Sequence, residues 1–145
     1  MNFVNDDGGR AAAGFRGQTG DCVCRAIAIA AQLPYAEVYA ALNNAALRER
    51  PRVGRKKRSS ARTGVQIPTI RHYLASIGWR WIPTMQVGSG CKVHLRADEL
   101  PSGRLIVSVS RHVVAVIDGV VHDTHDPSRD GTRCVYGYYT KDAPF

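Results

Sequence analysis

The chain has 145 residues, 44% of them hydrophobic and 22% charged, a balance that fits one globular domain, residues 1–145, with its own core. No apolar run approaches the roughly 20 residues needed to cross a bilayer, which excludes a membrane span. The acidic start, MNFVNDDGG, lacks the apolar stretch of a secretory signal. These features predict a soluble, cytoplasmic protein.

The formal net charge of +8 is concentrated in one segment of the chain. Without that segment the chain is close to neutral, so its charge does not indicate a nucleic-acid surface over the whole domain. The basic residues of the segment are Arg48, Arg50, Arg52, Arg55, Lys56, Lys57, Arg58 and Arg62.

The first half of the chain predicts an arm followed by three helices. Residues 1–19 are rich in Gly and Ala, show little periodicity and are expected to form an N-terminal arm. Apolar residues at helical spacing predict helices over about 22–32, 34–48 and 67–77. A basic loop over residues 49–63 separates the second helix from the third.

The second half of the chain predicts strands. Asp118-Gly119 between two apolar runs is a strong signal for a two-residue hairpin turn. Helices followed by strands indicate an α+β fold. The expected strands cover residues 79–83, 105–110, 112–117, 120–124 and 133–140.

The four cysteines are Cys22, Cys24, Cys91 and Cys134, and they do not resemble a disulfide framework. Cys22 and Cys24 are too close within one helix to bridge each other, and no CxxC pair indicates a zinc site. Reduced thiols are therefore the expectation.

Cys22 is the candidate nucleophile. It is expected at the first turn of a helix, where unpaired N–H groups favour the thiolate form of a cysteine. A small buried residue is the commoner role of a free cysteine. Cys24 would face roughly the opposite side of that helix, and we assign it to packing.

His112 is the candidate general base, because it opens an apolar strand and its ring can emerge at the rim of the sheet. If Asp118-Gly119 forms the turn, Ile117 pairs with Val120, and Asp123 lies on the same face as His112 and diagonally next to it. Asp123 is therefore the candidate orienting carboxylate.

An oxyanion at this site needs at least two hydrogen-bond donors. The backbone N–H of Cys22 is one candidate, and the side chain of Gln18 or a backbone group of residues 17–20 is the other. A zinc site at His122, His125 and Cys134 is disfavoured, because the two histidines point to opposite faces of the predicted hairpin. No metal or organic cofactor is expected.

Several segments together resemble small papain-like cysteine peptidase domains of bacteria and phages, and are most similar in pattern to the C39-like peptidases. These segments are GDCVCRAIAIA, PYAEVYAAL, LPSGRLIVSVSRHVVAVIDGVVHDTHDPSR and CVYGYY, and the likeness covers about residues 14–139. It implies N-terminal helices packed on a C-terminal antiparallel sheet, and a location in the host cytoplasm if the protein is phage-encoded. It also implies a Cys-His-Asp triad acting on a peptide or protein substrate. Transfer of the family's Asp-Pro motif favours Asp126 as the third residue, whereas the hairpin register favours Asp123.

The expected function is therefore that of a cysteine peptidase, which cleaves a peptide or isopeptide bond through a thioester. The alternative is a catalytically silent papain-like module that binds nucleic acid or an acidic partner. That module would use the basic loop, with Arg55, Lys56, Lys57 and Arg58 as its contacts.

Overall fold

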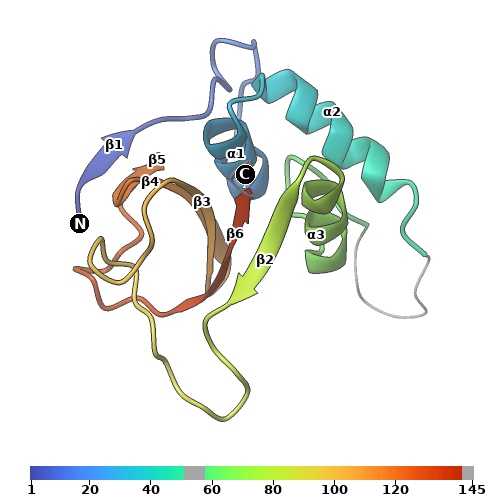
Figure 1. Ribbon diagram of the computed structural model, residues 1–145. Helices are drawn as coiled ribbons and strands as arrows, with labels where there is room; N and C mark the ends of the chain where they lie inside the picture. The colour runs from blue at the N-terminus through green and yellow to red at the C-terminus, as the bar shows by residue number, and fades with distance from the viewer. Residues whose placement is uncertain (51–57, 142–145) are drawn as a thin grey trace.

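The computed structural model describes residues 1–50 and 58–141, and within them the fold is α+β, as predicted. Three helices and one six-stranded mixed sheet make up the described part of the chain (Figure 1), and none of its helices is long and apolar enough to cross a membrane. The helices are α1 (Cys22–Ala31), α2 (Tyr35–Ala46) and α3 (Ile67–Ser76). The strands are β1 (Phe3–Asn5), β2 (Trp79–Pro83), β3 (Arg104–Val109), β4 (His112–Ile117), β5 (Val120–Asp123) and β6 (Val135–Lys141).

The strands follow one another across the sheet in the order β1-β5-β4-β3-β6-β2. The hairpin between β4 and β5 has the predicted register, with Ile117 opposite Val120 and Val116 opposite Val121. Asp118 (φ 48°) and Gly119 (φ 77°) both adopt the left-handed conformation that this tight turn requires. The register sets which residues of β5 share a face with His112.

The prediction of a wholly antiparallel sheet is wrong, because β1 pairs with β5 in parallel. The start of the expected arm is this edge strand, in which Phe3 lies opposite Val121 and Asn5 opposite Asp123. A three-residue strand is too short to show an alternating pattern, and its pairing depends on the free edge of β5.

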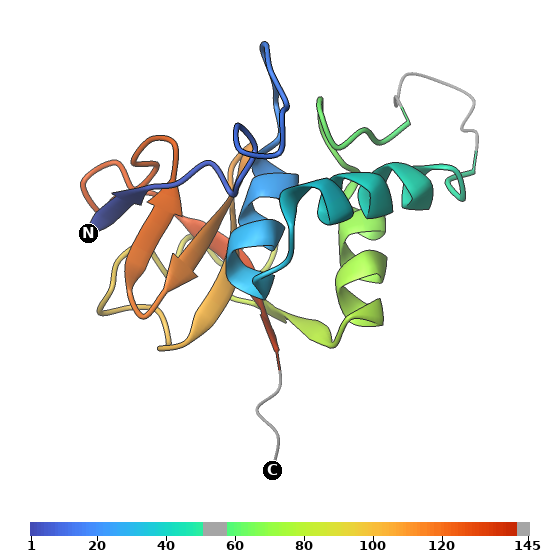
Figure 2. The ribbon, with the colours of Figure 1, turned by 90° about the horizontal axis from the view of Figure 1, so that it is seen from above.

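The three helices cover one face of the sheet (Figure 2), and α1 lies directly against β4. Successive side chains of β4 point to opposite faces of the sheet. Ala115 joins the core beneath the helices, and Val114 and Val116 join a second core on the other face, beside Leu95 and Leu100.

The expectation that all four cysteines are reduced is wrong, because Cys91 and Cys134 form a disulfide. The chain around Cys91 runs along the start of β6, where the N–H of Val135 donates to the carbonyl oxygen of Val93. This pairing joins an irregular segment to a strand 43 residues later, so the sequence contains no spacing that predicts the bridge.

Candidate active site

Cys22 is the first residue of α1 and lines an open cavity of about 640 Å³. The first hydrogen bond of the helix runs from the N–H of Arg25 to the carbonyl oxygen of Asp21. The N–H groups of Cys22 and Val23 therefore have no acceptor within the helix, and they give this end a partial positive charge. A thiolate or a developing oxyanion is favoured at this position.

His112 and Asp123 are brought together by the β4–β5 hairpin, as its register predicts. The Nε2 atom of His112 lies 2.6 Å from Oδ2 of Asp123, and Asp123 is only 1% exposed. Asp126 instead is exposed, and its carboxylate accepts a hydrogen bond from the N–H of Ser128. Of the two carboxylates considered, the structure thus joins Asp123 to His112.

Cys22 and His112 line the same cavity, and each acts on the pKa of the other. Because Nε2 of His112 is used by Asp123, Nδ1 is the ring nitrogen available to the thiol. Burial opposes the thiolate, yet the hydrogen bond and charge of His112, the N–H of Val113 and the charge of Arg25 lower the pKa of Cys22 overall. Burial also opposes the imidazolium, but Asp123 and Cys22 raise the pKa of His112 to about 9. Each of the two groups therefore favours the charged form of the other.

Cys24 shows the opposite behaviour and packs in the core, as predicted. It is fully buried, and its thiol donates only to the carbonyl oxygen of Tyr35. Burial raises the pKa of Cys24 to about 12, so this thiol stays protonated and unreactive.

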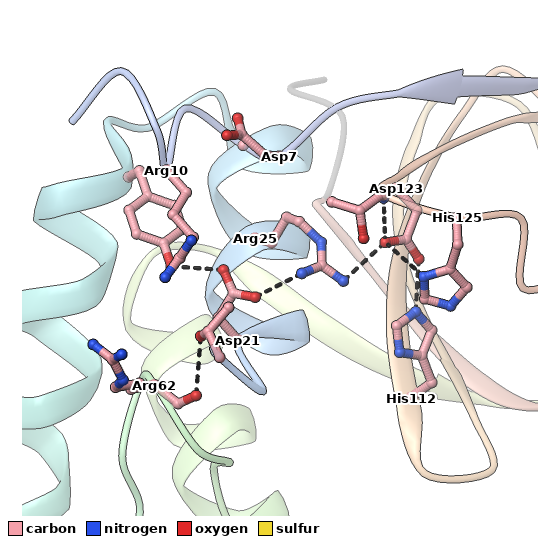
Figure 3. Close-up of polar contacts among 12 residues, drawn as sticks. Asp7, Arg10, Asp21, Arg25, Arg62, His112, Asp123 and His125 are labelled. Atoms are coloured by element: carbon pink, nitrogen blue, oxygen red, sulfur yellow. Dashed lines mark hydrogen bonds and ion pairs between the residues drawn. The ribbon is translucent and has the colours of Figure 1, made fainter. Parts of the chain in front are cut away.

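Asp123 is held by a second group that the sequence reasoning missed, the guanidinium of Arg25 (Figure 3). Nη2 of Arg25 donates to Oδ1 of Asp123 over 2.8 Å, and Nη1 donates to Oδ1 of Asp21 over 2.6 Å. The hydroxyl of Tyr35 donates to the other oxygen of Asp21, also over 2.6 Å. A continuous line of polar contacts therefore runs from α2 through α1 to β5 and β4.

One signal in the sequence could have identified Arg25. It is the only charged residue of α1, a helix that otherwise consists of Cys, Val, Ala and Ile. An arginine in such an apolar helix is expected to be buried, and a buried charge needs a partner. Asp21, one turn earlier, is the nearest candidate, whereas the sequence analysis left it without a role in the site.

Of the candidate second donors to an oxyanion, Gln18 lies away from the cavity, whereas Thr19 and Gly20 of the preceding loop line it. Gln18 is exposed and does not line the cavity. The N–H of Gly20 donates to the carbonyl oxygen of Arg62 over 2.6 Å, and the hydroxyl of Thr19 donates to the same oxygen. The start of α1 is thus the nearest source of free N–H groups.

The remaining histidines do not form the zinc site that was considered. Cys134 is in the disulfide, and Nδ1 of His122 lies 3.9 Å from a carboxylate oxygen of Asp6. His125 lies at the cavity, and its ring centroid is 5.1 Å from that of His112. Donor atoms of His112, Asp123 and His125 lie within 4.8 Å of one another, but Asp123 is already bound by Arg25.

The basic loop is described only in part. Arg55, Lys56 and Lys57, on which the binding-module alternative depended, lie outside the described residues. Arg58 is described and exposed, and its charge is one of the groups that lower the pKa of Glu49 against the effect of burial.

A second cavity of about 680 Å³ lies at the other end of α1, beside Ala30, Trp79 and Arg104. Neither a cysteine nor a histidine lines it, so it offers no nucleophile and no base near neutral pH. Of these two cavities among the described residues, the one at Cys22 has both a cysteine and a histidine in its lining.

No protein-family model matches the chain, and comparisons with curated proteins and with solved structures likewise find no match.

Proposed function

We propose that the protein is a papain-like cysteine hydrolase that cleaves a peptide or isopeptide bond. The observation that carries this proposal is that Cys22, at the start of a helix, shares a cavity with His112, whose Nε2 atom lies 2.6 Å from Oδ2 of Asp123. Nucleophile, base and orienting carboxylate in this relation are the groups that acyl transfer requires. The order Cys, His, Asp along the chain and the resemblance of the surrounding segments favour the papain-like, C39-like type.

In the first half of the reaction, the thiolate of Cys22 attacks the substrate carbonyl carbon, and the carbonyl π electrons move to oxygen. The N–H groups at the start of α1 stabilise this oxyanion. The imidazolium of His112 then gives its proton to the amine nitrogen, the C–N bond breaks, and a thioester to Cys22 remains.

In the second half, neutral His112 takes a proton from a water molecule whose oxygen attacks the thioester. The C–S bond breaks, the carboxylic acid leaves, and the thiolate is restored beside protonated His112. Asp123 keeps the imidazole in one tautomer and orientation throughout, because it accepts the hydrogen bond from Nε2.

The reactivity of Cys22 tests this proposal. A Cys24→Ser variant leaves Cys22 as the sole free thiol, so intact mass after brief iodoacetamide treatment reports its alkylation. We expect alkylation already at pH 5–6, well below the ordinary thiol pKa of about 8.5, and a shift of the profile to alkaline pH in Cys24→Ser/His112→Ala. An ordinary thiol profile in the first variant would refute the hydrolase.

A further inference from the structure

We propose that Arg25 is a positioning residue of the site, which fixes the carboxylate of Asp123 in the orientation that His112 needs. This inference rests on the proposed function and deepens it, since it adds a buried cation behind the triad. Arg25 lines the cavity at Cys22, but the hydrogen bonds of its guanidinium go to Asp21 and Asp123, and it acts through Asp123.

The division of the Asp123 carboxylate between its partners supports this role. Oδ1 accepts hydrogen bonds from Nη2 of Arg25 and from the N–H of Thr124, at 2.8 and 2.7 Å. Oδ2 lies 2.6 Å from Nε2 of His112. With both donors on Oδ1, rotation of the carboxylate about its C–C bond would break two hydrogen bonds. Oδ2 therefore stays directed at the imidazole.

The guanidinium has a second attachment that fixes its own position. Its other terminal nitrogen, Nη1, bonds Asp21 on the helix that carries Cys22, and Asp21 is in turn bonded by Tyr35. The planar guanidinium therefore connects the start of α1, which carries Cys22, to the end of β5, which carries Asp123. A lysine has a single ammonium nitrogen and cannot reproduce this fork.

The charges of the buried groups are a second, independent reason to assign this role to Arg25. Asp21 and Asp123 are each 1% exposed, and Arg25 is 8% exposed. Two buried carboxylates this close repel each other unless a cation lies between them. Arg25 is that cation, and His112 supplies the second positive charge on the far side of Asp123. His125 also faces this carboxylate, with Nδ1 4.0 Å from Oδ1.

The N-terminal segment packs against the two residues of this ion pair. Gly8 lies directly on Arg25, where an added Cβ would come within 3.1 Å of the Arg25 carbonyl oxygen. The N–H of Asp6 donates to the carbonyl oxygen of Asp123 over 2.9 Å. The segment therefore covers both ends of the Arg25–Asp123 contact, and hydrogen bonds to charged groups are stronger in such a buried site.

The test compares Arg25→Lys with Asp21→Asn, both in the Cys24→Ser background. Each variant disturbs the same network, but only Arg25→Lys removes the guanidinium that bonds Asp123. We expect Arg25→Lys to lower the rate of Cys22 alkylation at pH 6 about tenfold, which corresponds to a rise of one unit in the thiol pKa. We expect Asp21→Asn to keep the rate within about twofold, because the amide oxygen of asparagine can still accept the hydrogen bond from Nη1 of Arg25. Both variants should unfold at lower urea concentrations than the parent.

If Arg25 only stabilises the fold, both variants lose stability while their alkylation profiles match that of the parent, and the inference is wrong. An ordinary profile in the parent itself would instead refute the hydrolase, so the two failures are distinguishable. Should Arg25→Lys not fold, Arg25→Met/Asp21→Asn removes one buried charge of each sign. The same tenfold loss is expected there, and an unchanged rate would overturn the inference.

Discussion

Asp6 donates its backbone N–H to the carbonyl oxygen of Asp123 across 2.9 Å, which joins the N-terminal strand to the carboxylate that orients His112. The edge strand β1 is thus part of the support of the site, although none of its residues lines the cavity. Changes at the beginning of the chain are therefore expected to reach Cys22 through Asp123.

Gly8→Ala tests this support, with Gly14→Ala as its control. Both glycines have a left-handed φ, 74° and 90°, so each substitution costs roughly 1 kcal/mol in backbone strain. Only at Gly8 does a Cβ meet Arg25, so we expect a further loss of about 1–3 kcal/mol there and slower alkylation of Cys22 at pH 6. Equal effects of the two substitutions on unfolding and alkylation would contradict this.

Asp123→Asn and Asp126→Asn distinguish the two carboxylates that the sequence left open. We expect Asp123→Asn to lower the pKa of His112 by at least one unit, since it removes the charge that accepts from Nε2. Asp126→Asn should leave the His112 titration within a few tenths of a unit. Histidine ring resonances followed by NMR against pH measure both, and the reverse ranking would reassign the third residue to Asp126.

The stability that Asp123 provides should depend on pH in a defined direction. Burial raises its pKa, but the His112 hydrogen bond, the charge of Arg25 and the N–H of Thr124 lower it overall. The folded protein thus binds this proton more weakly than the unfolded chain, in which the pKa is about 3.9. The contribution is fully present above pH 5 and is lost as the pH falls through the native pKa.

Urea unfolding of the wild type and of Asp123→Asn between pH 3 and 7 measures this contribution. The difference in unfolding free energy between the two proteins should shrink as the pH falls. A difference that stays constant over this range would show that the pKa of Asp123 is the same in the folded and the unfolded protein, which contradicts the prediction.

Tyr35→Phe should weaken the network from its other end. The substitution keeps the ring that packs against Phe15 and removes the donor to buried Asp21. Loss of the hydrogen-bond donor to a buried acceptor should lower the free energy of unfolding by about 1–2 kcal/mol, which urea unfolding measures. Tyr39 also packs on Phe15 but is only half-buried, so Tyr39→Phe is the control and should change stability by less than about 0.5 kcal/mol. Similar losses in the two variants would argue against a special role of the Tyr35 hydroxyl.

The Cys91–Cys134 disulfide should stabilise the fold independently of the site. The bridge closes a loop of 43 residues and so lowers the conformational entropy of the unfolded chain. This stabilises the folded protein by up to about 4 kcal/mol. We expect Cys91→Ser/Cys134→Ser to unfold at lower urea concentration, with the Cys22 alkylation profile unchanged. Addition of reductant should destabilise the wild type and not the double variant, whereas an equal response in both would contradict a bridge in solution.

The local parts of the fold and the site could be predicted from sequence. The helices end within about two residues of their expected limits, and the Asp118-Gly119 turn fixes the hairpin that joins Asp123 to His112. The Cys24 assignment also holds, because helical periodicity alone turns its side chain away from that of Cys22.

The parts that escaped prediction depend on long-range contacts. Arg25 and Asp123 are 98 residues apart, and their ion pair exists only because α1 packs beside the β4–β5 hairpin. The parallel pairing of β1 and the disulfide likewise join segments that have no local pattern in common. Such contacts follow from the packing of whole elements, which periodicity and turn signals do not specify.

The placement of Cys22 and Arg25 on one helix has a consequence for how this chain can vary. Cys22 and Arg25 lie three positions apart in regular helix, with two residues between them. Each residue added or removed between them would rotate one side chain relative to the other by about 100° around the helix axis. A change of side chain at position 23 or 24 would keep this relation, whereas a change in the length of the segment would separate Cys22 from Arg25. Insertions and deletions should therefore be far less tolerated here than in the loops that surround the cavity.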